Sequence, residues 1–160
     1  MSIVLRPYDP SRPGEANFVI KSWRESYADS DAAKRYAFHG RCPSFADRFK
    51  WHAPDEYYRT WDALIATLVS QCTVRMAEND ETGLLAGFVC WELTGPWGVV
   101  VHYVYTRLSA RGQGVAKQLI GELPGGRVMY THRGAGVTRV PDGWVFSEAP
   151  LYGVGGRLAA

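Results

Sequence analysis

The sequence predicts an α/β fold of the α+β kind: a single domain around a mixed, mostly antiparallel, twisted sheet flanked by helices. Three observations carry this prediction. Apolar residues recur at helical spacing in two stretches before residue 72. A hairpin pattern then covers residues 72–93, and a strand–helix–strand pattern covers residues 99–131. Hairpins pair strands antiparallel and strand–helix–strand units pair them parallel, so the predicted sheet contains both.

The N-terminal part predicts one strand and one helix. Residues 3–8 form a short β-prone run, which the turn-forming residues 9–14 end. A helix is expected from residue 15 to about residue 27, where Phe18, Val19, Trp23 and Tyr27 recur at helical spacing. Residues 30–50 are polar, dotted with aromatic residues and interrupted by glycine and proline, so we expect a loop with room for one short helix.

The clearest helix begins at Pro54. Proline suits the first helical position, and Asp55 and Glu56 lie where the helix dipole favours negative charge. One apolar stripe follows, made of Tyr57, Tyr58, Trp61, Leu64, Ile65, Leu68 and Val69. Such a stripe is typical of a face that packs into the core, and we interpret it so rather than as a substrate pocket.

The rest of the chain predicts the sheet and one more helix. Strands are expected at 72–77, 84–93, 99–106, 127–131 and 144–146, with turns at 79–83 and 94–98 and a helix at 114–123 that Pro124-Gly125-Gly126 ends. We expect one domain over residues 1–152 and a flexible tail at 153–160.

Composition and charge exclude several classes of protein. The net charge of +2 does not indicate a nucleic-acid binder. Three cysteines, Cys42, Cys72 and Cys90, are an odd number without C-x-x-C spacing, which argues against a structural zinc site, a disulfide framework and a catalytic thiol. The start of the chain lacks a signal-peptide pattern, and no apolar run approaches the roughly 20 residues of a membrane span. We therefore expect a cytoplasmic protein.

A glycine-containing loop between a strand and a helix carries the strongest functional pattern. It follows the strand 99–106 and contains Gly112 and Gly114. The first N–H groups of a helix have no partner within the helix, and glycine, which lacks a Cβ, lets a phosphate group come close to them. Arg107, Arg111 and Lys117 supply positive charge. The loop lacks the Walker pattern and the third small residue of the dinucleotide fingerprint. An ordinary turn that uses glycine for packing is the structural alternative.

The segment Arg111-Gly112-Gln113-Gly114-Val115-Ala116 resembles the [Q/R]-x-x-G-x-[G/A] motif of the GNAT superfamily of N-acetyltransferases at every specified position. The resemblance implies an acyl-CoA cosubstrate, acetyl-CoA first, no metal, and acyl transfer to an amine by direct attack. It places the pyrophosphate on the loop and the pantetheine arm along the preceding strand. The cofactor-binding residues it implies are Val104, Tyr105, Thr106, Arg111, Gly112, Gln113, Gly114, Val115, Ala116 and Lys117.

Two shorter strings, His102-Tyr103-Val104-Tyr105 and Tyr130-Thr131-His132, are similar to those of GNAT-like proteins encoded by bacteriophages. Some relatives in that setting act in the modification of phage DNA bases. This resemblance suggests an origin, not a substrate.

The catalytic residues are harder to assign. Many family members carry a helix after the fifth strand with a tyrosine acid, whereas residues 134–143 contain three glycines and a proline, which disfavour a helix. His102 is the first candidate base, since its intrinsic pKa lies near 6.5, and Glu92 is the second. Each has a structural alternative: a hydrogen-bonded strand histidine and a solvent-facing strand charge. Candidate acids are Tyr152, Tyr130 and His132.

Strand alternation makes one further prediction about the candidate base. It places His102, Val104 and Thr106 on one face of their strand and Tyr103 and Tyr105 on the other. Two histidines elsewhere, His39 and His52, lie in irregular segments and receive no role.

Two other functions stay open beside acyl transfer. One is a binding or regulatory module without turnover; the other is an acyltransferase that modifies a nucleic-acid base, which requires a basic surface joining Arg24, Arg41, Arg48 or Arg139 near the cleft. The acceptor is an amine of unknown identity on a small molecule, a protein or a modified base. We expect a monomer or a homodimer with no membrane contact.

Overall fold

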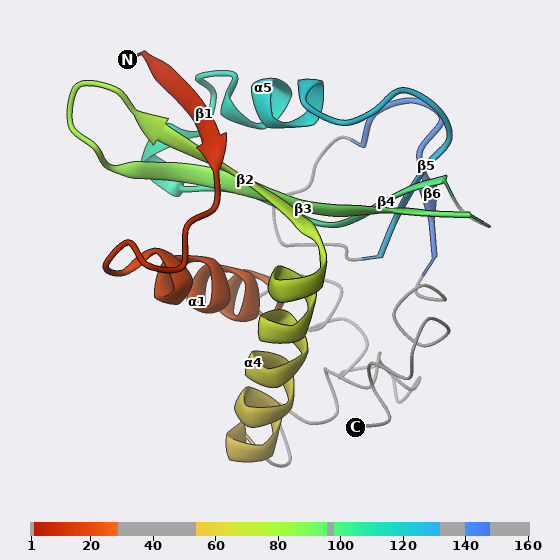
Figure 1. Ribbon diagram of the computed structural model, residues 1–160, viewed down its shortest axis with the longest axis horizontal. Helices are drawn as coiled ribbons and strands as arrows, with labels where there is room; N and C mark the ends of the chain where they lie inside the picture. The colour runs from red at the N-terminus through yellow and green to blue at the C-terminus, as the bar shows by residue number, and fades with distance from the viewer. Residues whose placement is uncertain (1, 29–53, 96–97, 132–139, 148–160) are drawn as a thin grey trace.

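The structure, a computed structural model, describes residues 2–28, 54–95, 98–131 and 140–147 (Figure 1). Its elements are β1 (Ile3–Pro7), α1 (Glu15–Ala28), α4 (Pro54–Gln71), β2 (Thr73–Asn79), β3 (Leu85–Thr94), β4 (Gly98–Thr106), the 3₁₀ turn η1 (Leu108–Ala110), α5 (Val115–Gly121), β5 (Val128–Tyr130) and β6 (Val145–Phe146). The predicted loop at 30–50 and tail at 153–160 lie outside the described residues, and the domain boundary at 152 stays a prediction.

The six strands form one sheet in the order β1-β2-β3-β4-β5-β6. The first three pairings are antiparallel, and the pairings β4–β5 and β5–β6 are parallel. This confirms the predicted mixed, mostly antiparallel sheet. The crossover through α5 makes β5 parallel to β4, as a strand–helix–strand unit requires.

Helices cover both faces of the sheet. Figure 1 shows α1 and α4 on one face and α5 on the other. The core under α1 and α4 consists of Val19, Trp23, Trp61, Leu64, Ile65, Leu68, Val74, Met76, Phe88, Cys90 and Tyr103. The core under α5 consists of Ala77, Ala86, Val89, Val99, Val101, Ala110, Val115, Leu119 and Val128.

The stripe predicted on α4 faces the first core. Ile65 and Leu68 are fully buried and Trp61 is 8% exposed. Complete burial of each aliphatic side chain stabilises the fold by about 1.5–3 kcal/mol before entropic costs. The predicted packing role is confirmed for the stripe residues whose side chains the structure describes, Tyr58, Trp61, Leu64, Ile65, Leu68 and Val69. None of the helices in the described residues combines the length and apolar character that crossing a bilayer requires.

The element boundaries differ from the predicted ones by a few residues. The strand expected from Cys72 starts at Thr73, and the helix expected over 114–123 covers only Val115–Gly121. The sequence analysis did not anticipate η1, which fits between β4 and the glycine loop.

The strand alternation predicted around His102 is wrong. In the β3–β4 pairing Cys90 lies opposite Tyr103 and Trp91 lies opposite Val101, so His102 is the extra residue of a β-bulge. Tyr103 therefore turns to the α1 side, where it stacks on Trp23 with ring centroids 5.0 Å apart. The bulge places His102 and Tyr103 on the same face.

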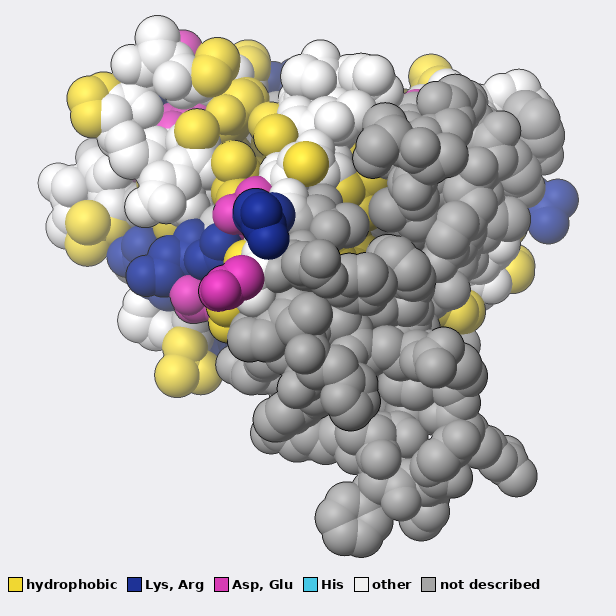
Figure 2. Space-filling model, turned by 90° about the horizontal axis from the view of Figure 1, so that it is seen from below, with side chains coloured by type: hydrophobic (Ala, Val, Ile, Leu, Met, Phe, Trp, Pro, Cys, Tyr) yellow, Lys and Arg dark blue, Asp and Glu magenta, His cyan; other side chains and the backbone are white. Residues whose placement is uncertain are grey.

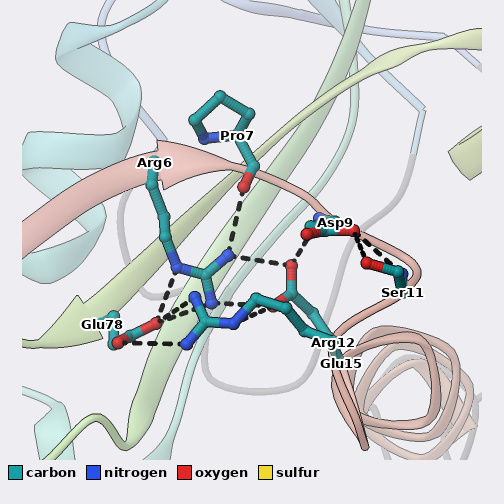
Figure 3. A network of polar contacts seen from close by, with 7 residues as sticks. All are labelled: Arg6, Pro7, Asp9, Ser11, Arg12, Glu15 and Glu78. Atoms are coloured by element: carbon teal, nitrogen blue, oxygen red, sulfur yellow. Dashed lines mark hydrogen bonds and ion pairs between the residues drawn. The ribbon is translucent and has the colours of Figure 1, made fainter.

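A network of ion pairs joins β1, the start of α1 and β2 (Figure 3). Arg6 on β1 lies 2.7 Å from Glu15 at the start of α1 and 2.6 Å from Glu78 on β2. Arg12 also pairs with Glu78, at 3.0 Å. Glu15 is 1% exposed and accepts a hydrogen bond from the backbone N–H of Asp9. A buried carboxylate is tolerated here because Arg6 and that amide satisfy its oxygens.

Candidate active site

The loop that the sequence singled out joins η1 to α5. Gly112 and Gly114 both adopt φ of 78°, a left-handed conformation that favours glycine. A Cβ built on either glycine meets no atom within 4 Å, so the space over the loop is open. Within the part of the chain that the structure describes, the N–H groups of residues 112–117 donate to no acceptor. The loop therefore offers a run of unpaired donors at a helix start.

The loop side chains hold its shape and leave positive charge exposed. Gln113 donates from Nε2 to the carbonyl of Ser109 at 3.1 Å, and Arg111 donates from Nε to the carbonyl of Thr106 at 3.4 Å. Val115 is buried in the core under α5, whereas Lys117 is exposed. This arrangement fits an anionic group such as a pyrophosphate.

The strand before the loop has an open edge. β4 pairs with β5 only at Val99, Val100 and Val101, yet β4 continues to Thr106. In the described residues, the outer edge of its last part has no strand partner. In an antiparallel ladder, alternate residues point their backbone N–H and C=O groups away from the partner strand, so part of the backbone between Val104 and Thr106 faces this edge.

The two candidate bases meet at the β3–β4 bulge. His102 Nε2 lies 2.8 Å from Glu92 Oε1. His102 Nδ1 lies 3.2 Å from the hydroxyl oxygen of Thr131, which directly follows β5. The His102 side chain is 0% exposed and that of Glu92 is 15% exposed. Glu92, the second candidate, is therefore the member of the pair that faces solvent.

The structure adds Cys72, to which the sequence gave no role. Its Sγ, a carboxylate oxygen of Glu92 and a ring nitrogen of His102 all lie within 4.8 Å of one another. Cys72 directly precedes β2, Glu92 lies on β3 and His102 lies on β4. Only the strand order and register bring the three together, so no local motif marks them.

These neighbours shift the ionisation of the cluster. A hydrogen bond with Cys90 lowers the pKa of Cys72, burial opposes it, and a hydrogen bond with His102 lowers it further, to about 6. Burial lowers the pKa of His102, but hydrogen bonds with Cys72 and Glu92 outweigh it and raise that pKa above its ordinary value. A negative charge on the Cys72 thiolate and a positive charge on the His102 ring stabilise each other in this largely buried site.

The remaining candidates are less central. The ring of Tyr130 packs against Phe146 and Trp144, with centroids 5.4 and 6.3 Å away. Tyr152, His132, His39 and His52 lie outside the described residues.

The described part of the α1–α4 face carries mixed charge. Arg24 pairs with Asp62 at 2.8 Å and lies over the ring of Tyr58. Figure 2 shows basic and acidic side chains side by side among the described residues of this face. Arg41, Arg48 and Arg139, which the base-modifying alternative requires near Arg24, lie outside the described residues.

Three solved structures are similar to this chain, each with a TM-score below 0.5. A candidate acetyltransferase of the GNAT family from Desulfovibrio desulfuricans is 13% identical with a TM-score of 0.45, over 76% of this chain and 63% of that one. YjaB from Escherichia coli is 20% identical with a TM-score of 0.43, over 76% of this chain and 63% of that one. An aminoglycoside 6′-N-acetyltransferase complexed with coenzyme A is 12% identical with a TM-score of 0.45, over 74% of this chain and 51% of that one.

The chain thus spans less than two thirds of each of these three proteins, and no curated protein matches its sequence. The family model for the acetyltransferase (GNAT) family matches residues 23–123, well over half of the chain. The match runs from α1 through the hairpin, β4 and the glycine loop to the end of α5. On this match, the chain belongs to the acetyltransferase (GNAT) family.

Proposed function

We propose that this protein binds an acyl-CoA, with acetyl-CoA as the first expectation, and transfers the acyl group to an amine by direct attack on the thioester. The glycine loop after β4 carries the proposal. Its six amides at residues 112–117 donate to no acceptor among the described residues, two of its glycines have open space for a Cβ, and it lies inside the segment that the family model matches. The acyl-CoA would supply the activated thioester: the amine forms a bond to the acyl carbon, the C–S bond breaks, and CoA leaves as the free thiol.

The loop and β4 form the cofactor site in this proposal. The amides of residues 112–117 donate to the pyrophosphate, and the exposed side chains of Arg111 and Lys117 add positive charge. The open edge of β4 at Val104, Tyr105 and Thr106 binds the pantetheine arm through backbone hydrogen bonds. An arm that follows β4 back from the loop reaches the bulge at His102.

The Glu92–His102 pair handles the proton of the attacking amine. Both ring nitrogens of His102 have partners and its side chain is fully buried, so an incoming ammonium cannot approach the ring. The Glu92 side chain is partly exposed, at 15%. Glu92 therefore accepts the proton, and His102 holds the carboxylate in place and balances its charge. This order of roles reverses the preference drawn from the sequence.

The experiment is a release assay for free CoA with a panel of amines that includes small polyamines, aminoglycosides, peptide N-termini and nucleosides. At least one amine should support turnover, and Glu92→Gln should lower it by about 10²–10⁴-fold, as loss of a general base does. Glu81→Gln, an exposed carboxylate in the β2–β3 turn, is the control and should keep turnover. Acetyl-CoA binding without turnover on any amine would favour the binding-module alternative.

The finer identity of the protein stays a prediction. A bacteriophage origin rests on the strings at 102–105 and 130–132, a cytoplasmic location rests on composition, and the class of amine and the oligomeric state await the assay and a sizing experiment.

A further inference from the structure

We propose that Cys72, Glu92 and His102 form a binding site for one divalent transition-metal ion of the zinc class, with three protein ligands and one open position. Binding of the ion does not depend on the proposed acyl transfer.

The donor atoms converge from three neighbouring strands. One thiol sulfur, one carboxylate oxygen and one imidazole nitrogen lie within 4.8 Å of one another. A zinc ion bonds sulfur at about 2.3 Å and nitrogen or oxygen at about 2.0–2.2 Å, so the ligand atoms of one ion lie within about 4 Å of each other. Small side-chain rotations bring the three atoms to that spacing, and the strands that carry them need not move.

The hydrogen bonds of His102 leave one ring nitrogen for a cation. In the tautomer that carries its proton on Nδ1, the Thr131 hydroxyl oxygen accepts Nδ1–H at 3.2 Å and its own proton goes to the backbone carbonyl of His102 at 3.4 Å. The Nε2 lone pair of the neutral ring then faces a Glu92 oxygen at 2.8 Å. Two such atoms approach to 2.8 Å when a hydrogen-bonding proton or a metal ion lies between them. A metal-ligating histidine donates its other ring N–H to an outer partner in this way.

The donor set selects the kind of ion. A thiolate with an imidazole and one carboxylate suits zinc and its neighbours among the transition metals, whereas magnesium and calcium require several hard oxygen ligands. His102 is fully buried, while Cys72 and Glu92 are partly exposed, so the fourth position opens on the side of those two residues. Three protein ligands with an open position are typical of catalytic rather than structural zinc sites.

Occupancy has a consequence that rests on the proposed function. The ion would bond the Nε2 lone pair of His102 and a carboxylate oxygen of Glu92. In the proposed acyl transfer, Glu92 accepts the proton of the amine and His102 holds Glu92 in place, so the ion would occupy both groups. A metal-loaded site therefore transfers no acyl group, although the glycine loop still binds the cofactor. Zinc would act on this enzyme as an inhibitor.

Cobalt(II) is the probe for the site because its thiolate complexes absorb in the near ultraviolet and its four-coordinate complexes absorb strongly in the visible. Chelator-treated protein, kept reduced and free of oxygen, is titrated with cobalt(II) and then with zinc. We expect both absorptions to saturate at one equivalent and zinc to abolish them. Cys72→Ser should remove the thiolate band. Thr131→Val should weaken cobalt binding by about 10–100-fold, as loss of an outer-shell partner does.

Cys90→Ser is the matched control, since Cys90 is the neighbouring thiol on β3 but is not one of the three convergent donors, and a serine hydroxyl can keep the hydrogen bond with Cys72. It should keep the thiolate band and the stoichiometry. Thermal melts establish that each variant is folded, and Cys72 is the ligand chosen for substitution because it is partly exposed. A titration without saturation at one equivalent, or a thiolate band that survives in Cys72→Ser, would overturn the proposal. Metal binding by a protein that never turns over would leave this site intact and remove only the proposed acyl transfer.

Discussion

Glu92 Oε1 lies 2.8 Å from His102 Nε2 because a β-bulge turns His102 toward the face of the sheet that carries α1 and α4. In a regular strand, either His102 or Tyr103 would point to the opposite face. Because of the bulge, His102 lies in the polar cluster with Glu92 and Cys72. Tyr103, on the same face, packs in the aromatic core against Trp23. Bulges often re-aim a side chain next to an active site.

The contact predicts that Glu92 and His102 act as one unit. Glu92→Gln and His102→Gln should each lower kcat/KM, and the double variant should lose less than the product of the two single losses. Residues in direct contact show such coupling, by about 0.5–3 kcal/mol. Steady-state kinetics of the four proteins on one accepted amine measures it. Strictly multiplicative losses would mean that the two side chains act independently.

The glycine loop predicts a charge-sensitive binding site. Gly114→Asp should abolish acetyl-CoA binding, since a carboxylate repels the pyrophosphate and a Cβ enters the open space over the amides. The strain of a non-glycine residue at this φ is about 1–2 kcal/mol, so the fold should survive. Gly143→Asp is the control because Gly143 also has positive φ and an unobstructed Cβ. Equal affinity in both variants, measured by calorimetry, would make the loop an ordinary turn.

The ion pairs around Glu78 predict acid sensitivity. Burial raises the pKa of Glu78, but hydrogen bonds from Arg6 and Arg12 outweigh it, and the net pKa is lowered. A carboxylate whose pKa is lower in the folded state stabilises the fold above its unfolded pKa of about 4.3. That contribution is lost as the pH falls through the folded pKa. Chemical denaturation below pH 5 should show a shallower pH dependence for Glu78→Gln than for the wild type; identical slopes would contradict the assignment.

The close approach of β3 and β4 predicts a strict requirement for Gly87. A Cβ there would lie 2.3 Å from the carbonyl oxygen of Tyr105, a backbone atom that must shift. Gly87→Ala should lower the free energy of unfolding by about 1–3 kcal/mol, as overpacking does. Gly121→Ala is the control: its Cβ meets nothing and lies in α5, so stability should rise by about 0.5–1 kcal/mol. Similar denaturation midpoints for the two variants would show that β3 and β4 shift to make room for the added methyl group at little cost in stability.

Local sequence patterns predicted most of the fold. Helical periodicity located α1 and α4, and β-branched runs between turn residues located the strands to within a few residues. The motif at Arg111–Ala116 located the loop because its function depends on consecutive residues. These features are encoded within single segments, so one segment suffices to recognise them.

The polar cluster could be predicted only in part, because it depends on pairing between segments. Glu92 and His102 were each candidates, but their contact requires the β3–β4 register and its bulge. Cys72 was set aside since no cysteine motif marks it in the chain, yet the pairing of β2, β3 and β4 brings it, directly before β2, close to His102. Strand register depends on how segments pair in the folded protein, so it cannot be predicted from one run of residues.

The most direct test of the account is whether acetyl-CoA binds the wild-type protein. At a concentration about 100 times its dissociation constant, a ligand that binds only the folded state stabilises it by about 2.7 kcal/mol. For a chain of this size that raises Tm by about 5–10 °C. We predict such a rise, saturable and reproduced by CoA, together with a one-to-one calorimetric isotherm. An unchanged Tm and no binding heat at millimolar acetyl-CoA, with the protein folded, would contradict the central claim.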